Sequence, residues 1–206
     1  MASNYLKAHP NDAQANLMIG LSHYRADNHG AARPFFETAL ALDPNYYITH
    51  DYLADALFML GDMTGSREHY ELFASFSPAV PKTYVRLGMI DLEETHVEQA
   101  VEQFNHALLL YENSGKKGPA VYEAQRAELA AVHARLGDVF FARSDYEAAR
   151  DELLKSTQIW PRNISAFFTL SLVYRRLGED VLASEAAEYY ESARRSMIEQ
   201  QGRAQR

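Results

Sequence analysis

The chain has 206 residues, of which 47% are apolar and 23% are charged, and its formal net charge is -8. This balance is typical of a globular chain that is long enough to bury a sizeable core. The negative charge argues against binding to nucleic acid, which requires a basic surface, and the absence of cysteine excludes disulfides, thiolate nucleophiles and cysteine metal sites.

The N-terminal residues contain neither the apolar segment nor the cleavage site of a secretory signal. No apolar run in the chain approaches the roughly 20 residues that a membrane-spanning helix needs. We therefore expect no membrane insertion and a cytoplasmic location. Residues 1–12 are expected to be the end of a helix whose partner helix is missing, either as a short native cap or because the chain is part of a longer protein.

Prolines and small residues recur along the rest of the chain with a period of 34 residues, as Pro10, Pro44 and Pro78 show. Within each period, apolar residues are spaced three and four apart on both sides of a short turn, which predicts two helices joined as a hairpin. A small residue in each first helix predicts a point of close helix approach. The apolar residue and the small residue that follows it are Ile19-Gly20, Leu53-Ala54, Leu87-Gly88, Leu136-Gly137 and Leu170-Ser171.

This pattern resembles the tetratricopeptide repeat. The resemblance implies an all-α fold, a right-handed superhelical solenoid of about five helix-turn-helix repeats that ends in a C-terminal capping helix. Residues 115–129 are expected to be an insertion that lengthens the first helix of the fourth repeat. The whole chain, 1–206, would then form a single array with repeats at 13–46, 47–80, 81–114, 130–163 and 164–200, the last of which includes the capping helix.

In the family that the chain resembles, the first helix of each hairpin lines a concave groove, so we expect a peptide segment to bind there. The groove positions are apolar and aromatic in the first two repeats and mainly basic in the last three, which predicts a partner with apolar and acidic groups. The apolar positions are equally compatible with the hydrophobic core, and the basic positions with a solvated surface. The predicted partner-binding residues are Leu17, Leu21, Tyr24, Tyr52, Asp55, Phe58, Lys82, Arg86, Met89, Arg135, Phe168 and Arg175.

Patterns that carry catalysis are absent from the sequence. No pair of its eight histidines flanks a glutamate with metalloprotease spacing, and the segment "SGKKGP" lacks the residues of a phosphate-binding loop. We therefore predict a non-catalytic protein-protein interaction module or scaffold with no catalytic residues, cofactor or metal. Two alternatives remain: a recruiting or regulatory domain of a larger enzyme or assembly, and a scaffold that assembles with itself through its N-terminal end.

Overall fold

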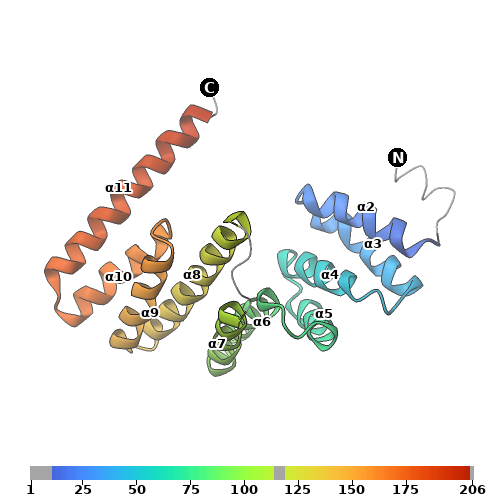
Figure 1. The fold of residues 1–206 in the computed structure, drawn as a ribbon, viewed down its shortest axis with the longest axis horizontal. Helices are drawn as coiled ribbons and strands as arrows, with labels where there is room; N and C mark the ends of the chain where they lie inside the picture. The colour runs from blue at the N-terminus through green and yellow to red at the C-terminus, as the bar shows by residue number, and fades with distance from the viewer. Residues whose placement is uncertain (1–10, 114–118, 205–206) are drawn as a thin grey trace. The chain divides into compact units, whose positions relative to one another are not determined.

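The structure is a computed structural model that describes residues 11–113 and 119–204. Within these residues it contains α-helices and no strand, so the all-α prediction is confirmed (Figure 1). Most of the predicted N-terminal cap and residues 115–118, the start of the predicted insertion, lie outside the described residues. The chain divides into two compact units, Met1–His96 and Val97–Arg206, and the boundary falls inside the predicted third repeat.

The first unit contains five described helices, in which each hairpin packs on the next. They are α2 (Ala13–Arg25), α3 (His29–Leu42), α4 (Ile48–Met59), α5 (Met63–Phe76) and α6 (Pro81–Glu93). Helix α2 packs against α3, both α3 and α5 pack against α4, and α5 packs against α6. The apolar residues at the centre of this unit therefore come from several helices at once, as a stack of hairpins requires.

The second unit contains helices of more varied length. They are α7 (Val97–Asn113), α8 (Pro119–Ala142), α9 (Tyr146–Ile159), α10 (Ile164–Leu177) and α11 (Asp180–Ala204). Helix α8, which is the first helix of the fourth hairpin, has 24 residues, whereas α10 has 14. Residues 119–129 are therefore continuous with this first helix. Helix α11 has 25 residues and extends well past α10 (Figure 1).

Each of the short turns that join α2 to α3, α4 to α5, α6 to α7, α8 to α9 and α10 to α11 has one residue with a positive φ angle, located two positions before the next helix begins. These residues are Asp27, Gly61, Thr95, Ser144 and Gly178, with φ angles between 53° and 82°. Their spacing repeats the period of the sequence. Only two of them are glycine, the residue that adopts this backbone conformation most readily, so a search for glycine alone would miss the other three turns.

Two of the predicted points of close helix approach are confirmed. A Cβ atom added to Gly20 of α2 would lie 2.5 Å from Cε1 of Phe36 on α3, and one added to Gly137 of α8 would lie 2.5 Å from Cγ of Leu153 on α9. Both neighbouring side chains are fully buried. Each glycine thus leaves room for a large apolar side chain of the second helix.

Two histidines meet between α4 and α5. The Nδ1 atoms of His50 and His69 are 2.9 Å apart, and both rings are largely shielded from water. Burial lowers the pKa of each imidazole below its usual 6.5, and for His69 the neighbouring His50 lowers it further. Burial disfavours the protonated form, so both rings are neutral in the folded state at neutral pH.

We expect the first unit to lose stability as the pH falls below about 6.5, because the unfolded chain then binds protons that His50 and His69 exclude when folded. The melting temperature should therefore be lower at mildly acidic pH than at neutral pH. Replacing His69 with Gln should reduce this difference. The matched control is His106→Gln, which removes an exposed imidazole from α7, outside the first unit, and should leave the pH dependence of the first unit unchanged. Equal pH dependence in all three proteins would contradict the prediction.

Within the described residues, none of the helices combines the length and the apolar character needed to cross a lipid bilayer.

Candidate functional site

In the first unit, side chains from α2, α4, α5 and α6 converge on one buried carboxylate, that of Asp55. Its side chain is 1% exposed. The Tyr24 hydroxyl donates to Oδ2 at 3.0 Å, and the Arg86 Nε group donates to Oδ1 at 3.1 Å. The Tyr70 hydroxyl and the Lys82 ammonium group also donate to this carboxylate. Asp55 is therefore the hub of a network that fixes four side chains.

The charges of this network balance. Asp51 adds a second carboxylate, whose Oδ1 and Oδ2 atoms lie 3.2 and 3.3 Å from the Lys82 Nζ atom, so two anions face two cations. Burial alone would raise the pKa of Asp55, but the charges and hydrogen bonds of Lys82, Tyr70 and Arg86 outweigh it and hold this pKa below its usual range. Burial dominates for Asp51, and its pKa is raised despite Lys82. The ionised form of Asp55 is thus stabilised mainly by the two cations of α6, Lys82 and Arg86.

Four of the side-chain pairs between successive first helices share a sequence interval of 31 residues, and the pair of Asp55 with Lys82 has an interval of 27. The 31-residue interval is the 34-residue repeat less about one helical turn. A residue on one first helix therefore lies beside the residue one turn earlier in the next repeat. The pairs are Tyr24 with Asp55, Asp51 with Lys82, Asp55 with Arg86 and, in the second unit, Thr169 with Asp138 at 2.8 Å.

Aromatic side chains surround the hub and remain partly exposed. The ring centroids of Tyr24 and Tyr52 are 5.7 Å apart, and Tyr52 stacks on the buried Phe36 at 6.0 Å. The Arg86 guanidinium lies 4.9 Å from the centroid of Phe58, within cation-π range. Rings fixed in this way keep one side available for contact. We call the residues Tyr24, Tyr52, Phe58, Lys82, Arg86 and Met89 the aromatic-ionic face.

The structure corrects three of the predicted partner-binding residues. Leu17, Leu21 and Asp55 are 5%, 9% and 1% exposed, so the prediction that they contact a partner is wrong. Leu17 and Leu21 pack in one apolar cluster with Leu53 and Phe36, because α2 contacts both α3 and α4. Their alternative assignment, to the hydrophobic core, is the one the structure supports.

The predicted basic residues of the first unit are not available as an uncompensated positive surface. Lys82 and Arg86 are 39% and 27% exposed, but both pair with Asp51 or Asp55 as described above. The remaining predicted residues lie in the second unit, where Arg135 is on α8 and both Phe168 and Arg175 are on α10. Phe168 is 47% exposed.

One group of side chains in the described part of the chain has the composition of a metal site, but its two carboxylates pair with an arginine. Asp91, Glu94 and His96 bring three potential ligand atoms within 4.8 Å of one another. The Arg67 Nη2 atom lies 2.7 Å from Oδ1 of Asp91 and 2.7 Å from Oε2 of Glu94. The guanidinium thus already supplies the positive charge that these carboxylates need, and we interpret the group as an ion-pair cluster.

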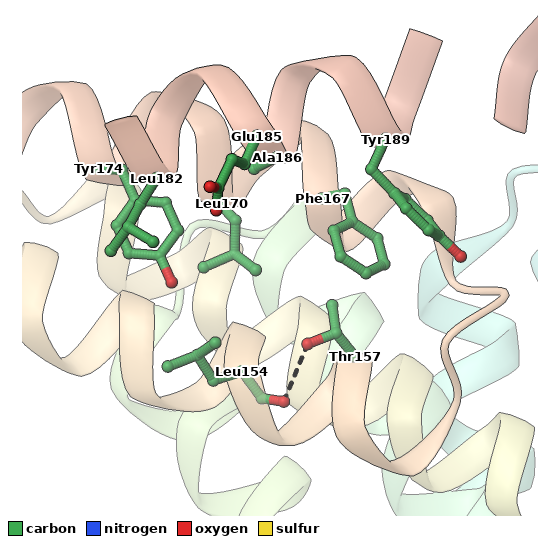
Figure 2. Close-up of a pocket in the computed structure, with 9 residues that line it drawn as sticks. All are labelled: Leu154, Thr157, Phe167, Leu170, Tyr174, Leu182, Glu185, Ala186 and Tyr189. Atoms are coloured by element: carbon green, nitrogen blue, oxygen red, sulfur yellow. Dashed lines mark hydrogen bonds between the residues drawn. The ribbon is translucent and has the colours of Figure 1, made fainter. Parts of the chain in front are cut away.

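The second unit has an apolar pocket between α9, α10 and α11, with a volume of about 240 Å³. Figure 2 shows side chains of α11 facing those of α9 across a floor contributed by α10. At one end of the pocket, the ring centroids of Phe167 and Tyr189 are 4.1 Å apart. Glu185 is the charged residue of the lining. The lining residues are Leu154, Thr157, Phe167, Leu170, Tyr174, Leu182, Glu185, Ala186 and Tyr189.

The helix pairs, the repeated turns and the recurring 31-residue interval between first helices define a helical-repeat protein. Comparisons with known proteins agree. The family model described as "Tetratricopeptide repeat" matches residues 1–47. The fold is similar to that of the crystal structure of MamA, with a TM-score of 0.71 and 19% identity over 88% of this chain and 97% of MamA. The resemblance to the tetratricopeptide repeat is thus confirmed: the chain carries this repeat at its N-terminus and has the tetratricopeptide-repeat fold.

Two other proteins are similar to this chain, one in structure and one in sequence. YrrB, whose crystal structure is described as that of a TPR protein with an unusual peptide-binding site, has a TM-score of 0.66 and 13% identity over 94% of this chain and 92% of YrrB. An uncharacterized protein of Haemophilus influenzae is 27% identical over 100 residues, which are 48% of this chain and 56% of that protein. The match with this curated relative therefore spans little more than half of its length.

Proposed function

We propose that the chain is a non-catalytic interaction scaffold whose first unit binds a peptide segment of a partner protein across the aromatic-ionic face. The observation that carries this proposal is the network around Asp55, which holds two partly exposed rings in place. Asp55 accepts a hydrogen bond from the Tyr24 hydroxyl, and Arg86, which is paired with Asp55, lies over the ring of Phe58. Aromatic side chains that are already ordered lose little conformational entropy on binding, so they are efficient contact residues. The description of YrrB as a peptide-binding TPR protein supports this use of the fold.

The chemistry of the face favours apolar groups of a partner over acidic ones in this unit. Its two cations are matched by the carboxylates of Asp51 and Asp55. An acidic peptide would have to displace these internal partners, whereas an apolar or aromatic side chain adds to the exposed rings without breaking an ion pair. Recognition of acidic groups is assigned to Arg175, an exposed residue of the second unit.

We predict that Tyr52→Ala weakens binding of a peptide to the first unit by about tenfold or more, since central aromatic contacts carry much of the energy of an interface. The peptide ligand is selected from a displayed library of random peptides by its binding to the chain. Isothermal titration calorimetry of the enriched peptide then gives Kd for the wild type and the variant. Far-UV circular dichroism checks that Tyr52→Ala keeps its helices.

The matched control for this experiment is Phe76→Ala. Phe76 is an aromatic residue at the end of α5 that is 50% exposed and lies outside the aromatic-ionic face. Its replacement should leave Kd unchanged. Peptides that bind Tyr52→Ala as tightly as the wild type, or that lose affinity only with Phe76→Ala, would show that the binding surface lies elsewhere.

A further inference from the structure

The second half of α11 extends beyond the other described helices of the second unit. Helix α10 has 14 residues and α11 has 25, which correspond to lengths of about 21 and about 37 Å. From Glu191 to Arg203, every residue of α11 except Ala193 is exposed. A helical segment of this length is marginal in water when it packs on nothing, so it needs a partner to be stable.

The exposed segment carries apolar and basic groups. Met197 is 48% exposed and Ile198 is 58% exposed, although both are large apolar residues. Arg194 and Arg195 precede them by about one turn. Between Ser192 and Arg203 the sequence has three arginines and one glutamate. A surface that accepts this segment must therefore be apolar at its centre and acidic around it.

The first half of the same helix offers such a surface. Leu182 and Tyr189 are 42% and 43% exposed and form one wall of the apolar pocket between α9, α10 and α11 (Figure 2). Between Asp180 and Glu191 the sequence has four acidic residues and no basic one. The carboxylate of Glu185 lines the pocket and forms no ion pair with any residue that the structure describes. The two halves of α11 are thus complementary in charge, and both expose apolar groups.

We propose that two copies of this chain associate through antiparallel α11 helices, so that the second half of each helix covers the pocket of the other copy. An antiparallel arrangement is the one that brings opposite halves together twice, which gives a closed two-fold interface. If Met197 enters the pocket beside Glu185, the two-fold axis passes near Glu191. Arg194 of each copy, whose Nη1 atom lies 4.0 Å from Oε2 of Glu191 on its own helix, is then level with Glu188 of the other copy.

The size of the pocket fits this occupant. Its volume of about 240 Å³ is below the range of about 300 to 1,000 Å³ that is usual for sites of small organic ligands, but it accommodates one or two protein side chains. Methionine has a flexible, unbranched side chain that fills irregular apolar gaps well. The apolar contact would stabilise the dimer, and the flanking charges would fix the direction of the two helices.

Sedimentation equilibrium of the full chain over a wide concentration range tests this proposal. We expect a monomer-dimer equilibrium. Glu188→Arg and Arg194→Glu should each weaken dimerisation by about tenfold or more, because each places two pairs of like charges in the symmetric interface. The double variant, which exchanges the two charges, should restore dimerisation to near the wild-type level. Met197→Asp should abolish it, since a carboxylate in the apolar pocket would be desolvated without a partner.

The matched control is Arg25→Glu, a charge reversal at an exposed position of α2 in the first unit, which should leave the dimerisation constant unchanged. Circular dichroism checks that each variant keeps its helices. A wild-type protein that stays monomeric at every concentration overturns the proposal. A dimer that tolerates both single charge reversals, or one that the double variant fails to restore, overturns it equally.

Discussion

We expect Asp55→Ala to lower the free energy of unfolding of the first unit by about 3 kcal/mol. The substitution removes the acceptor of Tyr70, whose side chain is fully buried and would keep an unsatisfied hydroxyl. It also removes the counter-charge of Lys82 and Arg86. These two cations are 39% and 27% exposed, so water can solvate them in part, and this keeps the loss at the lower end of what breaking a buried ion pair costs.

The matched control for Asp55→Ala is Asp51→Ala. Asp51 lies at the edge of the same network and pairs with Lys82, which keeps Asp55 as a partner. Burial raises the pKa of Asp51, so the folded state disfavours its charged form. We therefore expect this variant to cost less than about 1 kcal/mol.

Urea unfolding followed by far-UV circular dichroism measures both variants. Hydrogen exchange resolved by peptide shows whether the loss is confined to α2 through α6, as the position of the network predicts. If the two aspartate variants lose the same stability, Asp55 is not the hub of the network.

The helices and turns follow from the sequence because the signals for them are local. Apolar spacing within each hairpin and the small residues at Gly20 and Gly137 depend on contacts between neighbouring helices, and the 34-residue period repeats these signals. The positive φ angle of Thr95 does not follow from its residue type, since β-branched residues rarely adopt one. The period itself places the turn at Thr95, because Gly61 lies one repeat earlier.

The exposure of the first helices does not follow from the same signals. A first helix in a stack buries one stripe against its own hairpin partner and a second stripe against the next first helix. Leu17 and Leu21 belong to one cluster with Phe36 of α3 and Leu53 of α4. An apolar residue on the second stripe cannot be distinguished by helical spacing from one that faces a groove, so the sequence leaves both assignments open for the two leucines.

The ion pairs of the aromatic-ionic face have a sequence signal that becomes visible only once the repeat is known. Asp51 with Lys82 and Asp55 with Arg86 are opposite charges separated by 31 residues. A separation of this size means nothing in a single helix. In a 34-residue repeat it identifies neighbours on adjacent first helices, and it would have shown that the basic residues of α6 already have partners.

We expect Gly20→Val to destabilise the first unit by about 3 kcal/mol, because overpacking a rigid core forces side chains out of their preferred conformations. A Cβ atom at this position would lie 2.5 Å from Cε1 and 2.6 Å from Cδ1 of Phe36. The Phe36 ring is fully buried and stacks on Tyr52, so it cannot move aside without opening the contact between α2, α3 and α4. Gly20→Ala should also destabilise, but less, since alanine favours the helix by about 1 kcal/mol over glycine.

The matched control is Gly30→Ala, which introduces the same methyl group one helix later. No atom lies within 4 Å of a Cβ added at Gly30, in the first turn of α3. This variant should therefore stabilise the first unit by about 0.5 kcal/mol, through the reduced conformational freedom of the unfolded chain. Urea unfolding of the three glycine variants measures both signs in one series. A stabilising Gly20→Ala would mean that α2 and α3 are free to separate, and the close approach at Gly20 would then not determine the packing of this hairpin.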